Sequence, residues 1–126
     1  MIRRSGFTLI EMLLSIVVLA IILASVARYT SQYLHTVTIS TTRTAAAEVA
    51  RERIGLVDMD PSYLTLGATW SGTQIGFPGY PGMSRITTVS RVTGNNPRRD
   101  YTIVTVRVTE PTMGAPLDVT TVVASP

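Results

Sequence analysis

The sequence feature that most limits how this chain can fold is an apolar segment close to its N-terminus. Between Phe7 and Ala27 the sequence reads FTLIEMLLSIVVLAIILASVA, and Glu11 is its only charged residue. As an α-helix the segment spans about 30 Å, the thickness of the hydrocarbon core of a bilayer. Apolar side chains surround the whole helix and leave no polar stripe. We therefore expect a transmembrane or helix-bundle segment rather than an amphipathic surface helix.

The charges that flank the segment predict its orientation. Arg3 and Arg4 precede it, and basic residues concentrate on the cytoplasmic side of a membrane span. We expect a single-pass segment with the N-terminus in the cytoplasm and everything after Ala27 across the membrane.

Glu11 is the anomaly within the segment. An ionised acidic side chain at the centre of a bilayer costs about 2.5 to 3.5 kcal/mol on insertion scales, so it should have a positive partner. Arg28 is out of reach along the helix. A cut between Gly6 and Phe7 would supply a partner, because it creates an α-amino group that is protonated at neutral pH. We expect this amine and Glu11 to form an ion pair, within one chain or between neighbours.

The hexapeptide Gly6-Phe7-Thr8-Leu9-Ile10-Glu11 resembles the processing motif, GFTLIE, of type IV prepilins and type II secretion pseudopilins. In that family a membrane-embedded prepilin peptidase cleaves after the glycine and methylates the amino group of the phenylalanine. The resemblance implies that residues 1–6 are a leader and that Phe7 becomes an N-methylated N-terminus. It also implies that Glu11 aligns each incoming subunit with its neighbour.

The same resemblance implies a structural subunit that is not an enzyme and needs no cofactor. Such a subunit is anchored in the bacterial inner membrane. An inner-membrane assembly platform then packs it with other pilin or pseudopilin subunits into a helical pilus at the cell surface or a periplasmic pseudopilus.

Two further comparisons favour a minor subunit. Many major pilins carry a helix-breaking glycine and proline where this chain has Ala20 and Arg28. The closing hairpin, residues 98–126, also resembles minor pseudopilins of the I type and type IV pilus modification proteins. The residues leave open whether the filament belongs to a pilus, a type II secretion system or a competence system.

Two alternatives account for part of the N-terminal segment. A conventional secretory signal would use Arg3 and Arg4 as its basic region and would be cleaved after Ser25-Val26-Ala27. The apolar run is longer than such a signal needs, however, and contains a glutamate. A plain uncleaved membrane anchor explains the hydrophobicity but leaves Glu11 unpaired.

The helix is expected to continue well past the apolar segment. No proline occurs before Pro61 and no glycine between Gly6 and Gly55, so nothing local ends a helix before about residue 60. One stripe on its second half should face the head domain, with these residues at helical spacing: Leu34, Val37, Thr41, Ala45, Val49 and Leu56. The chain is thus expected to have four parts: a leader (1–6), a transmembrane or filament-core helix (7–28), the periplasmic half of the helix (29–60) and a β-sheet head domain (61–126).

Beyond Pro61 the composition changes to threonine, valine, glycine and proline, which is typical of strands and turns. The pattern predicts an antiparallel meander with a glycine-rich loop at 71–82 and with strands at 64–70, 83–93, 101–109 and 117–124. Within 101–109, one face should cover the helix: Thr102, Val104, Val106 and Val108. A break in alternation between Ile86 and Val89 suggests either a β-bulge or a wrongly placed strand boundary. The sequence therefore predicts an α+β, pilin-like fold in which a long N-terminal helix packs on a small antiparallel sheet.

The residue types limit the chemistry that is available. The chain has no cysteine and one histidine, His35, without clustered carboxylates, so we expect no metal or catalytic site. Four arginines could form a basic patch for DNA phosphates in a competence or tip subunit: Arg91, Arg98, Arg99 and Arg107. The alternative is that these arginines form a solvated face or protect a sheet edge.

Overall fold

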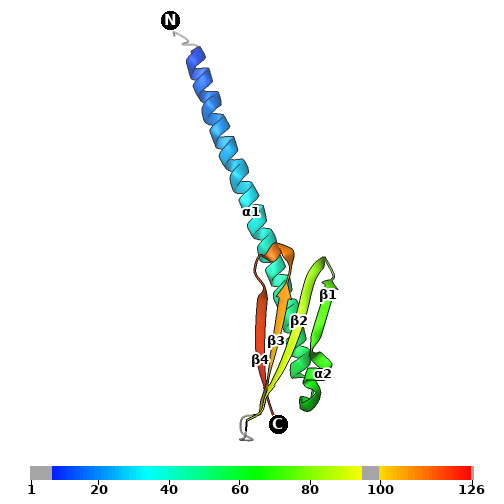
Figure 1. The fold of residues 1–126 in the computed structure, drawn as a ribbon. Coiled ribbons are helices and arrows are strands. Elements are labelled where there is room, and N and C mark those ends of the chain that lie inside the picture. The colour runs from blue at the N-terminus through cyan, green and yellow to red at the C-terminus, as the bar shows by residue number, and fades with distance from the viewer. Residues whose placement is uncertain (1–6, 95–99, 126) are drawn as a thin grey trace. The chain divides into compact units, whose positions relative to one another are not determined.

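The computed structural model describes residues 7–94 and 100–125, and the predicted leader, residues 1–6, lies outside this range. The described chain contains one long helix, α1 (Leu9–Asp58), followed by a four-stranded antiparallel sheet (Figure 1). It divides into two compact units, the first ending at Val37 and the second beginning at Thr38. The predicted α+β, pilin-like arrangement is confirmed.

In the first unit, α1 exposes its side chains around the whole circumference from Leu9 to Val37. Several serine and threonine hydroxyl groups in this part donate to backbone carbonyls of the helix itself. Ser15 Oγ donates to the Glu11 carbonyl and Ser25 Oγ donates to the Ile21 carbonyl, each at 2.8 Å. Such hydroxyls present no unpaired donor to lipid. By length and composition, α1 is the one helix among the described residues that qualifies as a membrane span.

In the second unit, the core lies between the C-terminal part of α1 and one face of the sheet. Small and β-branched side chains dominate this core, and most are completely buried. Its main members are Ala46, Ala50 and Val57 from α1, and Met83, Val104, Val106 and Val108 from the strands.

The predicted helix stripe was wrong by one position. Its bulkiest members, Leu34, Val37 and Leu56, are exposed, and Ala45 and Val49 are only partly buried. The buried stripe is formed by the neighbouring positions 42, 46, 50 and 57. The physical reason is that hydrophobicity favoured the larger residues, whereas close packing of a helix on a sheet places small side chains at the contact.

The four strands follow one another across the sheet in chain order. They are β1 (Gly72–Phe77), β2 (Tyr80–Val92), β3 (Tyr101–Thr109) and β4 (Leu117–Ala124). The predicted strands at 101–109 and 117–124 are confirmed, as is the antiparallel meander. The predicted strand at 83–93 is also present, although it begins earlier.

The predicted valine face of β3 is confirmed. Thr102, Val104, Val106 and Val108 are all buried, while the residues between them lie on the opposite, more exposed face. This alternation is what a strand covered on one side produces.

The segment between α1 and β2 was predicted wrongly. Residues 64–70 form no strand but a 3₁₀ turn, η1 (Tyr63–Thr65), and a short helix, α2 (Leu66–Trp70). Residues 71–82, expected to be a loop, instead contain β1 and the start of β2. The turn between these strands uses Gly79 at φ 80°, a conformation that only glycine adopts easily. Dense glycine therefore marked a hairpin here rather than a loop.

The predicted bulge near Ile86 was also wrong. β2 and β3 pair without interruption from Ser84↔Thr109 to Val92↔Tyr101. The alternation of hydrophobicity fails because Arg85 and Thr87 point to the buried face while Ile86 points outward. The register shift of the sheet lies in β1, between Ile75 and Phe77.

The helical structure of residues 66–70 can be tested with two leucines. Leu66 is 1% exposed, and Leu64, two positions earlier, is 73% exposed. We expect Leu66→Ala to lower the free energy of unfolding by about 2 to 5 kcal/mol through a cavity. Leu64→Ala should change it by about 0.5 kcal/mol or less. Unfolding of the detergent-solubilised chain in urea measures both. Equal losses would contradict the structure, because residues two apart share a face in a strand.

Candidate processing and assembly site

Thr8 and Glu11 build the N-terminus of α1. Thr8 precedes the first helical residue, Leu9, and its Oγ1 accepts a hydrogen bond from the Glu11 backbone N–H at 3.4 Å. In return, the Thr8 N–H and hydroxyl donate to Glu11 Oε2 at 3.3 and 3.2 Å. This reciprocal arrangement is a capping box, which satisfies two backbone donors that a helix end otherwise leaves free.

The capping box directs the Glu11 carboxylate back toward the start of the chain. Because the Thr8 nitrogen binds this carboxylate, the nitrogen of Phe7 lies one residue beyond the bonded group. Phe7 itself is exposed, and Gly6 lies outside the described residues. In the sequence, Glu11 was assigned by its charge in an apolar segment and by its place in the GFTLIE motif. The Thr-x-x-Glu spacing from Thr8 to Glu11 was a visible signal of a capping box as well.

Comparison with known proteins addresses this N-terminal segment directly. The family model of the prokaryotic N-terminal methylation motif matches residues 1–27. The chain carries the N-terminal methylation motif of type IV pilins and pseudopilins. The resemblance inferred from residues 6–11 is thereby confirmed. No curated protein and no solved structure matches the chain.

The motif supports a subunit of the pilin or pseudopilin type, and proteins of that type assemble with other pilin subunits into filaments. Together with the apolar first part of α1, it also indicates membrane anchoring and a surface filament.

The two described arginines of the predicted basic patch form separate ion pairs in the second unit. Arg91 makes two hydrogen bonds to Asp100, at 3.0 and 2.5 Å, and Arg107 makes two to Asp118, both at 2.7 Å. Arg91 pairs across the sheet with Thr102, a buried-face residue, so it lies on the opposite face from Arg107. The structure therefore does not bring these two arginines together.

The other two arginines of the predicted patch, Arg98 and Arg99, lie outside the described residues. His35 is exposed on α1, and no group of three or more metal-binding side chains occurs in residues 7–94 and 100–125.

Asp100 links four parts of the head. Besides the two bonds from Arg91, its carboxylate accepts a hydrogen bond from the Tyr63 hydroxyl at 2.9 Å, and its carbonyl accepts one from the Ser125 N–H. The Arg91 guanidinium lies 5.3 Å from the centre of the Tyr63 ring. These contacts tie η1, β2, β3 and the end of β4 together.

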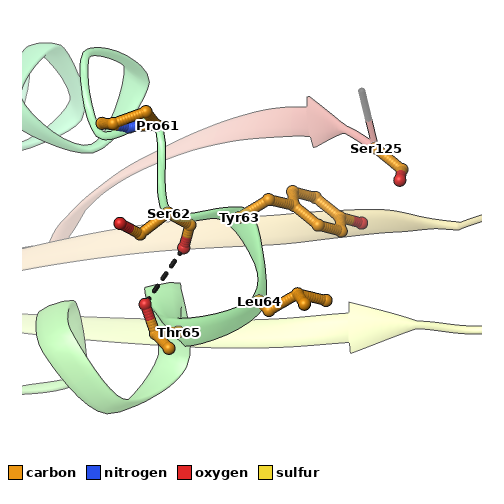
Figure 2. Close-up of a pocket in the computed structure, with 6 residues that line it drawn as sticks. All are labelled: Pro61, Ser62, Tyr63, Leu64, Thr65 and Ser125. Carbon is orange, nitrogen blue, oxygen red and sulfur yellow. Dashed lines mark hydrogen bonds between the residues drawn. The ribbon is translucent and has the colours of Figure 1, made fainter.

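An open cavity of about 460 Å³ lies beside this cluster (Figure 2). Its lining consists of Pro61, Ser62, Tyr63, Leu64, Thr65 and Ser125. Figure 2 shows the Tyr63 side chain on the same side as Ser125, while Thr65 donates its hydroxyl to the Ser62 carbonyl at 3.2 Å. The side chains that line this cavity offer hydroxyl groups but no carboxylate, imidazole or amine.

The sequence analysis missed a buried arginine. Arg85 is 4% exposed, donates to the Val49 carbonyl at 3.0 Å and to Gln74 Oε1 at 2.5 Å, and lies over the Phe77 ring. Burial lowers the pKa of Arg85, and the nearby Arg53 guanidinium lowers it further. Its position could have indicated its burial, because Arg85 is two residues after the buried Met83 and residues two apart in a strand lie on the same face. Arg85 thereby joins α1 to β1 and β2.

The Asp100 cluster predicts a pH dependence of stability. The hydrogen bond from Arg91 and, more weakly, that from Tyr63 hold the pKa of Asp100 below its usual 3.8. A lowered folded-state pKa stabilises the protein above the usual value, and this contribution is lost as the pH falls through the folded-state pKa. We expect Asp100→Asn to lower the thermal midpoint at neutral pH, with the gap to wild type closing below about pH 4.

Circular dichroism of the detergent-solubilised chain measures this midpoint. Asp58→Asn is the matched control, since Asp58 is exposed at the end of α1 and is expected to leave the pH profile of wild type unchanged. A gap between Asp100→Asn and wild type that stays constant down to low pH would contradict the assignment.

Proposed function

We propose that this chain is a minor structural subunit of a type IV pilus or a related pseudopilus. Prepilin peptidase cleaves it between Gly6 and Phe7 and methylates the new amino group of Phe7. The observation that carries the proposal is the methylation motif over residues 1–27, with Glu11 four positions after the proposed new N-terminus.

The exposed apolar surface of α1 supports this route. An apolar surface of this extent needs lipid or other apolar surfaces around it. In the proposed sequence of events, residues 7–28 first cross the inner membrane once, with the N-terminus in the cytoplasm. Contacts with other subunits then replace lipid as an assembly platform draws the chain into the filament. Residues 29–60 and 61–126 form the helix and head beyond the membrane.

Glu11 has two tasks in this proposal. Its backbone and side chain close the capping box with Thr8, and its charge attracts the amino group that cleavage creates. In lipid this attraction is weakly screened, so an unpaired Glu11 favours contact with the N-terminus of a neighbouring subunit. Head-to-tail addition of this kind grows an open-ended helical filament.

The minor role is supported by the continuity of α1. The helix runs from Leu9 to Asp58 through Ala20 and Arg28, without a glycine or proline at either position. A helix without such residues has little tendency to open locally when it is packed into a filament.

Processing can be tested by mass spectrometry of the protein purified from its native membrane or filament. We expect a chain that begins at Phe7 and carries one methyl group on its α-nitrogen. A start at Arg28 would indicate a conventional secretory signal, and an intact Met1 would indicate a plain anchor. Either result would overturn the proposed processing.

The two tasks of Glu11 can be separated by a pair of substitutions. Glu11→Gln keeps a side chain that can close a capping box but removes the charge, whereas Glu11→Ala removes both. We expect both variants to insert in the membrane and both to be strongly depleted from filaments, as measured by immunoblot of sheared filaments against membranes. Thr8→Ser, which keeps hydroxyl and charge, is the control and should be incorporated normally. Normal incorporation of Glu11→Gln would show that charge is not required.

A further inference from the structure

The first unit of α1 has a polar and aromatic face at the point where the apolar run ends. Ser25, Arg28, Tyr29, Gln32 and Tyr33 follow the spacing i, i+3, i+4, i+7 and i+8, which places them on one side of the helix. Tyr29 and Tyr33 are 73% and 68% exposed. The apolar run before them carries no comparable face.

A shallow groove of about 460 Å³ lies on this face. It is lined by Ile21, Ala24, Ser25, Arg28, Tyr29 and Gln32. Ala24 and Ser25 contribute small side chains to this lining, and Arg28, Tyr29 and Gln32 contribute larger polar ones. The lining therefore combines a cation, three further hydrogen-bonding side chains and the apolar residues Ile21 and Ala24.

Arg28 has no acidic partner in this part of the chain. Residues 12–47 contain no aspartate or glutamate, and none of the ion pairs among the described residues includes Arg28. Arg28 is also the only basic residue other than His35 between Phe7 and Thr42. Its charge is thus available to an external anion.

We propose that Arg28, Tyr29 and Gln32 bind the phosphate of a phospholipid at the membrane boundary distal to the N-terminus. This inference rests on the proposed membrane span of residues 7–28. A guanidinium forms paired, charge-assisted hydrogen bonds with phosphate oxygens. Tyrosine is enriched at the headgroup level because one end of its ring is apolar and the other polar.

Such a contact fixes how deep the helix lies in the bilayer. Arg28 is 17 positions from Glu11, about 25 Å along a helix at 1.5 Å per residue. With Arg28 held at one boundary of a hydrocarbon core about 30 Å thick, Glu11 lies about 5 Å inside the other. Phe7, the first described residue, then lies near the opposite boundary, within reach of a membrane-embedded peptidase.

The depth of the helix can be measured with a single spin label, because the natural chain has no cysteine. Ser31→Cys provides a labelling position about one turn beyond Arg28. The full chain is reconstituted in vesicles of phosphatidylcholine and in vesicles of digalactosyldiacylglycerol, whose headgroup contains no phosphate. Collision of the label with oxygen, relative to a water-soluble nickel complex, reports its depth.

In phosphatidylcholine we expect Arg28→Gln to move the label toward the hydrocarbon by about one helical turn, ~5 Å. Arg43→Gln, with the same change of charge farther along α1, should leave the depth unchanged. In the galactolipid, Arg28→Gln and the chain with native Arg28 should lie at the same depth.

Three outcomes would overturn the inference. An equal shift in the galactolipid would mean that hydration rather than phosphate holds Arg28. If Arg28→Gln does not shift the label in phosphatidylcholine, Arg28 does not anchor the helix through phosphate. The proposed membrane span would not be contradicted by that result. A second label, at Leu19→Cys near the middle of the apolar run, tests the span itself. Exposure of that label to water in every vesicle would reject the span, and the proposed function with it.

Discussion

The apolar side chains of α1 up to Ala27 lie exposed in the described structure, so this part of the chain requires lipid or other subunits around it. A helix suits apolar surroundings because its backbone groups are paired internally. Here the hydroxyl groups of Ser15 and Ser25 also donate to carbonyls of the helix itself. The charged residues of this part lie at its two ends: Glu11 is near its start, and Arg28 directly follows its last residue, Ala27. The methylation motif, residues 1–27, overlaps this apolar part of α1, so the same residues carry the motif and the exposed apolar surface.

The head domain has a small hydrophobic core, so polar contacts between its elements add to its stability. Alanine and valine make up six of the ten buried hydrophobic residues in the described part of the chain, and a core of this size supplies modest stabilisation. Polar contacts join the elements that surround it. The Arg53 guanidinium lies 4.8 Å from the centre of the Trp70 ring, and the Trp70 indole donates to Asp60 at 2.6 Å. With the contacts of Arg85 and Asp100, these bonds tie α1, α2 and the strands together.

Prediction from the sequence succeeded where one signal dominated. In β3 every second residue from Thr102 to Val108 is apolar or threonine, so strand and buried face followed from alternation alone. It failed where two signals competed. Residues 71–82 are rich in glycine and proline, yet β1 and β2 pair through them, because Gly79 serves the turn of a hairpin. In β2 a charged residue, Arg85, occupies a buried position. The alternation of apolar and polar residues therefore appeared broken, although the pairing of β2 with β3 is regular.

The sequence by itself determined the N-terminal methylation motif and the long apolar run with Glu11 inside it, because these are local properties of consecutive residues. It also determined that a helix continues past the apolar run, since no residue there breaks one. Only the tertiary structure decided which side of α1 meets the sheet, that Arg85 is buried, and that Arg91 and Arg107 face opposite ways. The side of α1 that packs on the sheet depends on how closely helix and sheet can approach. The position of each arginine depends on its interaction partners. Residues distant in the chain determine both the packing distance and the partners.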